Sequence, residues 1–131
     1  VSIMLDLRNR EIKVFLVDDN RLFIEGLSAL LARRKNFKIV GMATRGKEAL
    51  EKIGKIKPDL VIMDVVLPDA SGIDLTGEII SCWPQIKVVV LSVYDDPEFQ
   101  KAALEKGAFA YLVKGGSINH LIETLNRAFI N

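Results

Sequence analysis

The chain has 131 residues, the size of one domain that can bury a sufficient core without disulfides or structural metal. Its 18 basic and 17 acidic residues give a formal net charge of +1, which argues against charge-driven binding to nucleic acid or membranes. The single cysteine, Cys82, permits no intramolecular disulfide, and we interpret it as a packing thiol. No apolar stretch approaches the roughly 20 residues of a membrane span, so we expect a cytoplasmic protein without membrane contact.

Short apolar strands alternate with amphipathic helices along the chain. The predicted strands lie at residues 12–17, 37–42, 60–63, 87–91 and 110–113. The predicted helices lie at residues 21–34, 46–53, 73–82, 97–106 and 117–129. With right-handed crossovers, this alternation predicts an α/β, flavodoxin-like (βα)5 three-layer sandwich with a five-stranded parallel sheet of order 2-1-3-4-5.

Residues at the ends of these segments support the assignment. Pro97 suits a first helical turn, Gly107 a helix stop, and Ser117 an N-cap. Residues 1–11 show no sustained period, so we divide the chain into an N-terminal extension at 1–11 and one domain at 12–131.

Four of the predicted strands end in polar residues. Asp18 and Asp19 follow the first strand, Asp64 the third, Ser92 the fourth and Lys114 the fifth. Because ligands of such sheets bind outside the carboxyl ends of the strands, we expect these side chains to meet at one edge.

Three carboxylates at one edge repel one another, by roughly 4 kcal/mol for two charges about 4 Å apart at an effective dielectric near 20. Oxygen ligands with room for water suit Mg²⁺, which commonly works beside a phosphate. Asp64 could then attack phosphorus to give an aspartyl phosphate, while Mg²⁺ and Lys114 neutralise the transferring oxygens and Ser92 donates a hydrogen bond. Each residue alone is readily a turn, cap or surface residue, but their joint placement is much less easily accidental.

These residues resemble the receiver domain of two-component response regulators, over about residues 12–130. The resemblance is carried by Val17-Asp18-Asp19, by Asp64 with Pro68 and Gly72 four and eight residues on, by Leu91-Ser92, and by Tyr111-Leu112-Val113-Lys114.

The resemblance implies a role for each site residue. Asp64 would accept a phosphoryl group from a sensor histidine kinase. Asp19, Asp64 and the main-chain carbonyl of Val66 would ligate Mg²⁺, with Asp18 acting largely through water. Lys114 would pair with the phosphate. Ser92 and Tyr111 would form a switch pair in which the hydroxyl moves to the phosphoryl group and the ring turns inward. Such a domain is no enzyme in the usual sense, because it catalyses only its own phosphorylation and dephosphorylation.

The sequence looks most similar to the NarL/LuxR-type subgroup, whose members usually carry a C-terminal helix-turn-helix. Because this chain holds no such output domain, we expect it to be the N-terminal part of a DNA-binding transcriptional regulator, with DNA contact only through a part absent from this chain. A homodimer on phosphorylation is a further expected partner. The chain departs from the subgroup at Asn20-Arg21, where His-Pro is common, and Gly115 stands where many receivers have Pro.

Three other interpretations were considered. A nucleotide-binding module would need a glycine-rich first turn, and no glycine precedes Gly26 between the first strand and its helix. A Mg²⁺-dependent phosphatase would need a general acid two residues after the nucleophile, where Val66 stands. The remaining alternative is a stand-alone receiver or a pseudo-receiver that acts as a protein-binding module.

Overall fold

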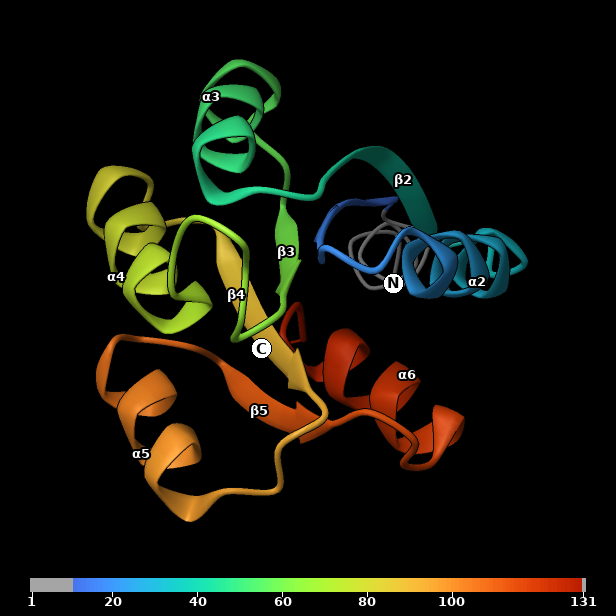
Figure 1. Cartoon of the computed structure of the whole chain (residues 1–131). Coiled ribbons are helices and arrows are strands. Elements are labelled where there is room, and N and C mark those ends of the chain that lie inside the picture. Colours follow the sequence, from blue (N-terminus) through green and yellow to red (C-terminus); the bar gives the residue numbers. More distant parts are fainter. Residues whose placement is uncertain (1–10, 131) are drawn as a thin grey trace.

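The computed structural model describes residues 11–130, and the predicted alternation of strands and helices is present throughout (Figure 1). The strands are β1 (Ile12–Val17), β2 (Phe37–Ala43), β3 (Leu60–Met63), β4 (Lys87–Ser92) and β5 (Ala110–Val113). The helices are α2 (Arg21–Ala32), α3 (Gly46–Ile56), α4 (Gly72–Cys82), α5 (Pro97–Glu105) and α6 (Ile118–Arg127).

All five strands form one parallel sheet of order β2-β1-β3-β4-β5, which confirms the predicted topology. Helices α3, α4 and α5 cover one face of this sheet, and α2 and α6 cover the other (Figure 1). In the register of β1 and β3, Val17 pairs with Met63. The first residues beyond these two strands, Asp18 and Asp64, therefore leave the sheet side by side.

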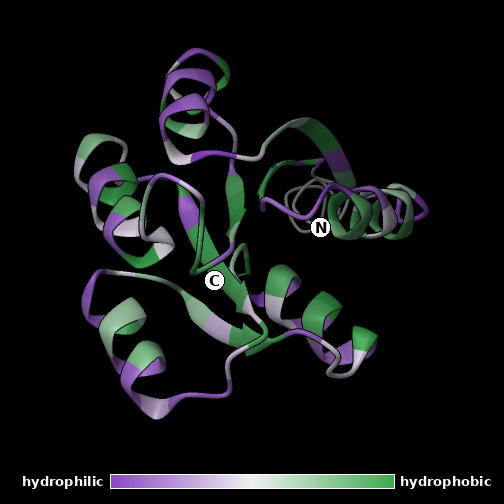
Figure 2. Cartoon of the chain, in the orientation of Figure 1, coloured by the Kyte–Doolittle hydropathy of each residue, from purple (hydrophilic) through white to green (hydrophobic). Residues whose placement is uncertain are grey.

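Each face of the sheet carries its own apolar core, and the apolar colouring gathers on the strands and the inward sides of the helices (Figure 2). Phe15 and Met63 belong to the core under α3, α4 and α5, whereas Leu16 and Ile62 belong to the core under α2 and α6. A strand buried on both faces is expected to be continuously apolar, and the central strand β3 is apolar and buried throughout. The strand ends are thereby held rigidly in position.

Several predicted ends are wrong by a turn or less. Helix α2 ends at Ala32 rather than at residue 34, and α3 continues to Ile56, three residues beyond the prediction. Lys57 ends α3 in the left-handed region with φ 52°, a C-cap that the sequence alone does not mark. The predictions for Pro97, Gly107 and Ser117 are confirmed, because Pro97 begins α5, Gly107 has φ 105°, and the Ser117 side chain accepts from His120 N.

Cys82 is exposed, so the interpretation as a packing thiol was wrong. Ile79 and Trp83, four residues apart, face the core at this end of α4 and leave Cys82 outside. Glu11 is the only described residue of the predicted extension at 1–11, and this boundary stays a prediction. Among residues 11–130, no helix is both long and apolar enough to cross a bilayer.

Candidate functional site

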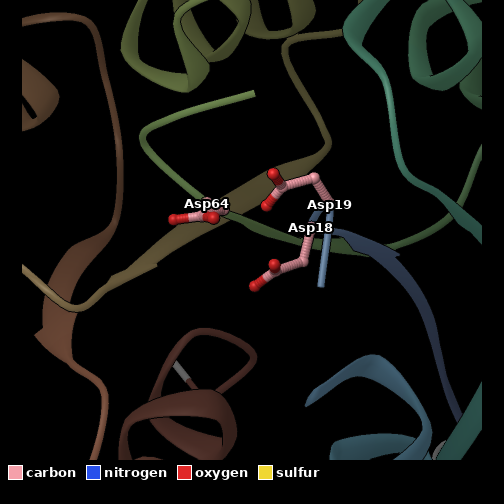
Figure 3. Close-up of side chains that lie close together, drawn as sticks. All are labelled: Asp18, Asp19 and Asp64. Carbon is pink, nitrogen blue, oxygen red and sulfur yellow. The ribbon is translucent and has the colours of Figure 1, made fainter. Parts of the chain in front are cut away.

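Asp18, Asp19 and Asp64 meet at the carboxyl edge of the sheet, as predicted (Figure 3). The first two follow β1 and the third follows β3, and one ligand oxygen from each lies within 4.8 Å of the others. Asp18 and Asp64 are buried, whereas Asp19 is exposed. The main chain fixes this spacing, because Asp64 N donates to the carbonyl of Val17 at 2.9 Å.

Lys114 brings the balancing positive charge from the end of β5. Its Nζ lies 2.6 Å from Asp18 Oδ2 and 3.6 Å from Asp64 Oδ2, and its side chain is only 12% exposed. The ammonium group therefore bridges the two buried carboxylates, with the closer contact to Asp18.

The site perturbs the protonation of the Asp64 carboxyl. Burial, with the nearby charge of Asp18, raises its pKa from the ordinary value of 3.8 to about 6, although Lys114 acts in the opposite direction. Near neutral pH the group is therefore an anion held at some cost to the fold, and a cation bound beside it would be favoured.

The donor set fits a hard divalent cation. Three carboxylates within one small volume, one of them open to solvent, supply oxygen ligands and leave positions for water, which is the environment that Mg²⁺ prefers. Val66, two residues beyond Asp64, belongs to the loop that follows β3, and its side chain is half exposed.

This loop is tightly closed around Asp64. Gly72 N donates to the carbonyl of Val65 at 2.7 Å, and a bridge pairs Val66 with Ser71. A Cβ on Gly72 would lie 1.7 Å from the carbonyl oxygen of Asp64, so only glycine fits there. The glycine eight residues after Asp64 is thus explained by a close approach of the main chain.

Asp69 ties the same loop to α3, a contact that the sequence analysis did not find. Its carboxylate accepts from Gly46 N at 2.7 Å and Lys47 N at 3.1 Å, at the first turn of the helix. These main-chain hydrogen bonds lower the pKa of Asp69. Gly46 and Asp69 are 23 positions apart in the sequence, so local sequence patterns give no signal for this cap.

Ser92 and Tyr111 are joined through the main chain of Tyr94. The Oγ of the fully buried Ser92 accepts from Tyr94 N at 3.1 Å, while the Tyr111 hydroxyl donates to the carbonyl oxygen of Tyr94. The Tyr111 ring lies inward, at 9% exposure, and the Tyr94 ring meets Phe99 edge-on at 5.6 Å. A shift at Ser92 would therefore be felt at the β4–α5 loop and at Tyr111.

Two further residues at the site were missed. Asn20 is the N-cap of α2, with Oδ1 accepting from Phe23 N at 3.1 Å, and its own N–H donates to Asp18 Oδ1 at 2.9 Å. The Phe23 ring lies against the Lys114 ammonium, 4.3 Å from Nζ to the ring centroid. Asn20 in place of the subgroup's common His was a visible departure, but nothing in the sequence paired Phe23 with Lys114.

A doubly wound parallel sheet with clustered carboxylates and a lysine at its carboxyl edge defines a class of α/β domain that handles phosphoryl groups with a metal ion. Residues 14–126 match the family described as the response regulator receiver domain, and the chain belongs to this family.

Similar curated proteins are regulators that extend well beyond the matched region. The transcriptional regulatory protein DegU of Brevibacillus brevis is 35% identical over 115 residues, which is 88% of this chain and 49% of that protein. The response regulator GacA of Pseudomonas syringae is 35% identical over 118 residues, 90% of this chain and 55% of that protein. The chain thus spans about half the length of the curated relatives it matches.

Solved structures agree with the NarL/LuxR-type resemblance. A LuxR-family response regulator from Aurantimonas superposes with TM-score 0.86 at 27% identity, over 91% of this chain and 85% of that one. The receiver domain of the putative response regulator NarL from Mycobacterium tuberculosis gives 0.84 at 28% identity, over 91% and 97%. CheY from Borrelia burgdorferi, solved with CheX, BeF3 and magnesium, gives 0.87 over 96% and 99%, and at 22% identity supports the fold alone.

Proposed function

We propose that Asp64 is the phosphoacceptor of this receiver domain and that a sensor histidine kinase supplies the phosphoryl group. The observation that carries the proposal is the position of the Asp64 carboxylate, which lies 3.6 Å from Lys114 Nζ and within 4.8 Å of ligand oxygens of Asp18 and Asp19. A nucleophile, a cation site and a fixed ammonium are the parts that phosphoryl transfer requires.

In the proposed reaction an Asp64 carboxylate oxygen forms the new bond to phosphorus. The bond from phosphorus to the imidazole nitrogen of the donor breaks, and the electron pair stays on that nitrogen. Lys114 stabilises the transferring oxygens, and the hydroxyl of Ser92 then donates to one of them. Asp19, Asp64 and the carbonyl of Val66 would hold Mg²⁺, with Asp18 acting largely through water, and the ion would neutralise charge on the phosphoryl oxygens.

The structural change caused by phosphorylation would reach the protein surface through the switch pair, Ser92 and Tyr111. Once Ser92 donates to the phosphoryl group, its contact with Tyr94 N changes, and the Tyr94 carbonyl that receives the Tyr111 hydroxyl moves with it. The affected surface comprises α5, β5 and α6. This is a shift between two populated states of one interaction surface, for which a homodimer is the simplest partner.

In the whole protein this surface would control a DNA-binding output domain. Support comes from the two curated relatives DegU and GacA. DegU is named a transcriptional regulatory protein, and both extend well beyond the matched region. The receiver itself would have no substrate other than its own phosphodonor.

The test is intact-protein mass after incubation with Mg²⁺ and acetyl phosphate. We expect a gain of about 80 Da that hydroxylamine removes, as for an acyl phosphate. Asp64→Asn should gain nothing. Asp69→Asn, which changes an acid in the same loop and keeps an acceptor for the α3 cap, is the matched control and should be modified like the wild type. A folded, Mg²⁺-binding protein that neither acetyl phosphate nor a kinase modifies would indicate the alternative, a pseudo-receiver that acts as a protein-binding module.

A further inference from the structure

The Lys114 ammonium lies against an aromatic ring as well as against two carboxylates. Besides Asp18 and Asp64, Nζ lies 4.3 Å from the centroid of the Phe23 ring. The face of such a ring carries negative electrostatic potential, and its attraction for a cation strengthens as water is removed. With the Lys114 side chain only 12% exposed, the ring is a substantial part of the ammonium's surroundings.

Phe23 is held in place by the same carboxylate that binds the lysine. Asp18 Oδ1 accepts a hydrogen bond from Asn20 N, and Asn20 Oδ1 accepts one from Phe23 N. The Phe23 ring contacts the Lys114 ammonium, which in turn forms an ion pair with Asp18 Oδ2. This closed circuit fixes the first turn of α2 against the end of β5. The ring is therefore positioned by the site itself as well as by its packing against the core under α2 and α6.

The Phe23 ring differs from the Asp18 and Asp64 carboxylates because it has no second chemical role at the site. Asp64 is the proposed nucleophile, and Asp18 is shared with the proposed cation site, so both carboxylates have roles that compete with the lysine. A hydrocarbon ring is neither a metal ligand nor a nucleophile. It can keep hold of the ammonium while the carboxylates are otherwise engaged.

We propose that Phe23 is a positioning residue for phosphoryl transfer, which holds the Lys114 ammonium at the site through its ring face. The inference rests on the proposed function of Asp64 and Lys114. Its structural alternative is that Phe23 only fills space beside the core, and the two readings differ in a measurable way. Ring electrostatics matter in the first and not in the second.

The experiment replaces Phe23 with phenylalanines carrying one, two, three and five ring fluorines, which withdraw the negative potential stepwise with little change in shape. The rate of phosphorylation by acetyl phosphate at saturating Mg²⁺ is followed by intact mass. We expect a graded fall that reaches about threefold to tenfold. The same series at Phe37 is the control and should leave the rate unchanged. Phe37 is a buried residue at the start of β2, the outer strand on the opposite side of the sheet from β5.

A second readout needs no phosphorylation. In the wild-type protein without Mg²⁺, the ring current of Phe23 should move the NMR signals of the Lys114 ε-methylene protons upfield. Phe23→Leu should abolish that displacement, whereas Leu22→Ala, at an exposed position in the same turn, should preserve it.

The outcomes separate this inference from the function on which it rests. A phosphorylated protein whose rate is flat across the Phe23 series overturns the role of Phe23 alone, as does an equal fall in the Phe37 series. An unshifted Lys114 methylene signal in the wild type overturns the contact. A wild-type protein that acetyl phosphate and a kinase both leave unmodified overturns the proposed function and this inference with it.

Discussion

Replacing Asp64 by asparagine should stabilise the protein at neutral pH when no divalent cation is present. The carboxylate is buried beside Asp18, and its pKa is raised to about 6. The folded state therefore disfavours the anion that exists above that pH. Asparagine keeps the shape of the side chain and removes the charge.

The size of the effect follows from the pKa. A rise in the pKa of Asp64 from 3.8 to about 6 corresponds to a free energy of about 3 kcal/mol before any reduction for solvent screening. Part of the carboxyl group reaches solvent, with the side chain 11% exposed, and screening reduces the expected gain to about 1–2 kcal/mol. Because the folded pKa lies above the unfolded one, stability from this group is fully present below pH 3.8 and is lost as the pH rises through about 6.

Urea unfolding in EDTA at several pH values measures this difference. At pH 7.5 the midpoint of Asp64→Asn should exceed that of the wild type by about 0.5–1 M. The difference should shrink toward zero as the pH is lowered to 4, since the wild-type carboxyl is then protonated in the folded state. Adding Mg²⁺ should stabilise the wild type more than the variant, because binding to the folded state adds to its stability.

Asp69→Asn is the matched comparison, because the pKa of Asp69 is lowered rather than raised. Its contribution to stability is present above the ordinary pKa of an aspartate and is lost as the pH falls. This variant should therefore lose stability at pH 7.5, where Asp64→Asn gains it. If Asp64→Asn lowered the midpoint at pH 7.5, or if its gain were the same at pH 4, the electrostatic reasoning would be refuted.

Three further predictions concern the same site. The affinity for Mg²⁺, measured by calorimetry, should weaken by about tenfold for each pH unit below about 6, because a protonated Asp64 is a poor ligand. Lys114→Met should slow phosphorylation by acetyl phosphate about a hundredfold, as measured by intact mass, because the transferring oxygens lose a fixed cation. Gly72→Ala should cost about 3 kcal/mol or prevent folding, because its Cβ would meet the Asp64 carbonyl oxygen at 1.7 Å, and thermal denaturation measures the loss. Gly26→Ala is its control, because beyond the neighbouring residues and the backbone of helix α2 nothing lies within 4 Å of the new Cβ, and it should stabilise the helix by up to about 1 kcal/mol.

The sheet and the cluster of acids were predictable because both follow from short-range patterns. Four of the five predicted strands are apolar runs that a polar residue ends, and in a parallel sheet this places Asp18 and Asp64 at one edge. Helix ends were predictable where a special residue marks them, as at Gly107 and Ser117. The end of α3 was not, because Lys57 takes the left-handed conformation without belonging to a residue type that favours it.

The contacts that refine the site could not be predicted, because they join residues far apart in sequence. Asp69 caps α3 from the loop after β3, and the Phe23 ring meets Lys114 across the edge of the sheet. Each pairing depends on the distance between two elements after packing. Asp69 in a loop and Phe23 on an amphipathic helix are ordinary residues until that distance is known.

The geometry of the site explains why a bound cation would be favoured there. The hydrogen bond from Asp64 N to the carbonyl of Val17 fixes the main chains of β1 and β3, so the repelling carboxylates cannot separate without breaking the sheet. A slip of one residue in this register would turn Asp64 to the other face. On the other side of the site, Lys114 N donates to the carbonyl of Ser92 at 2.7 Å, which holds these two residues together. The protein therefore carries the unfavourable charge of Asp64 in its folded state, and a cation bound beside Asp64 would reduce that cost.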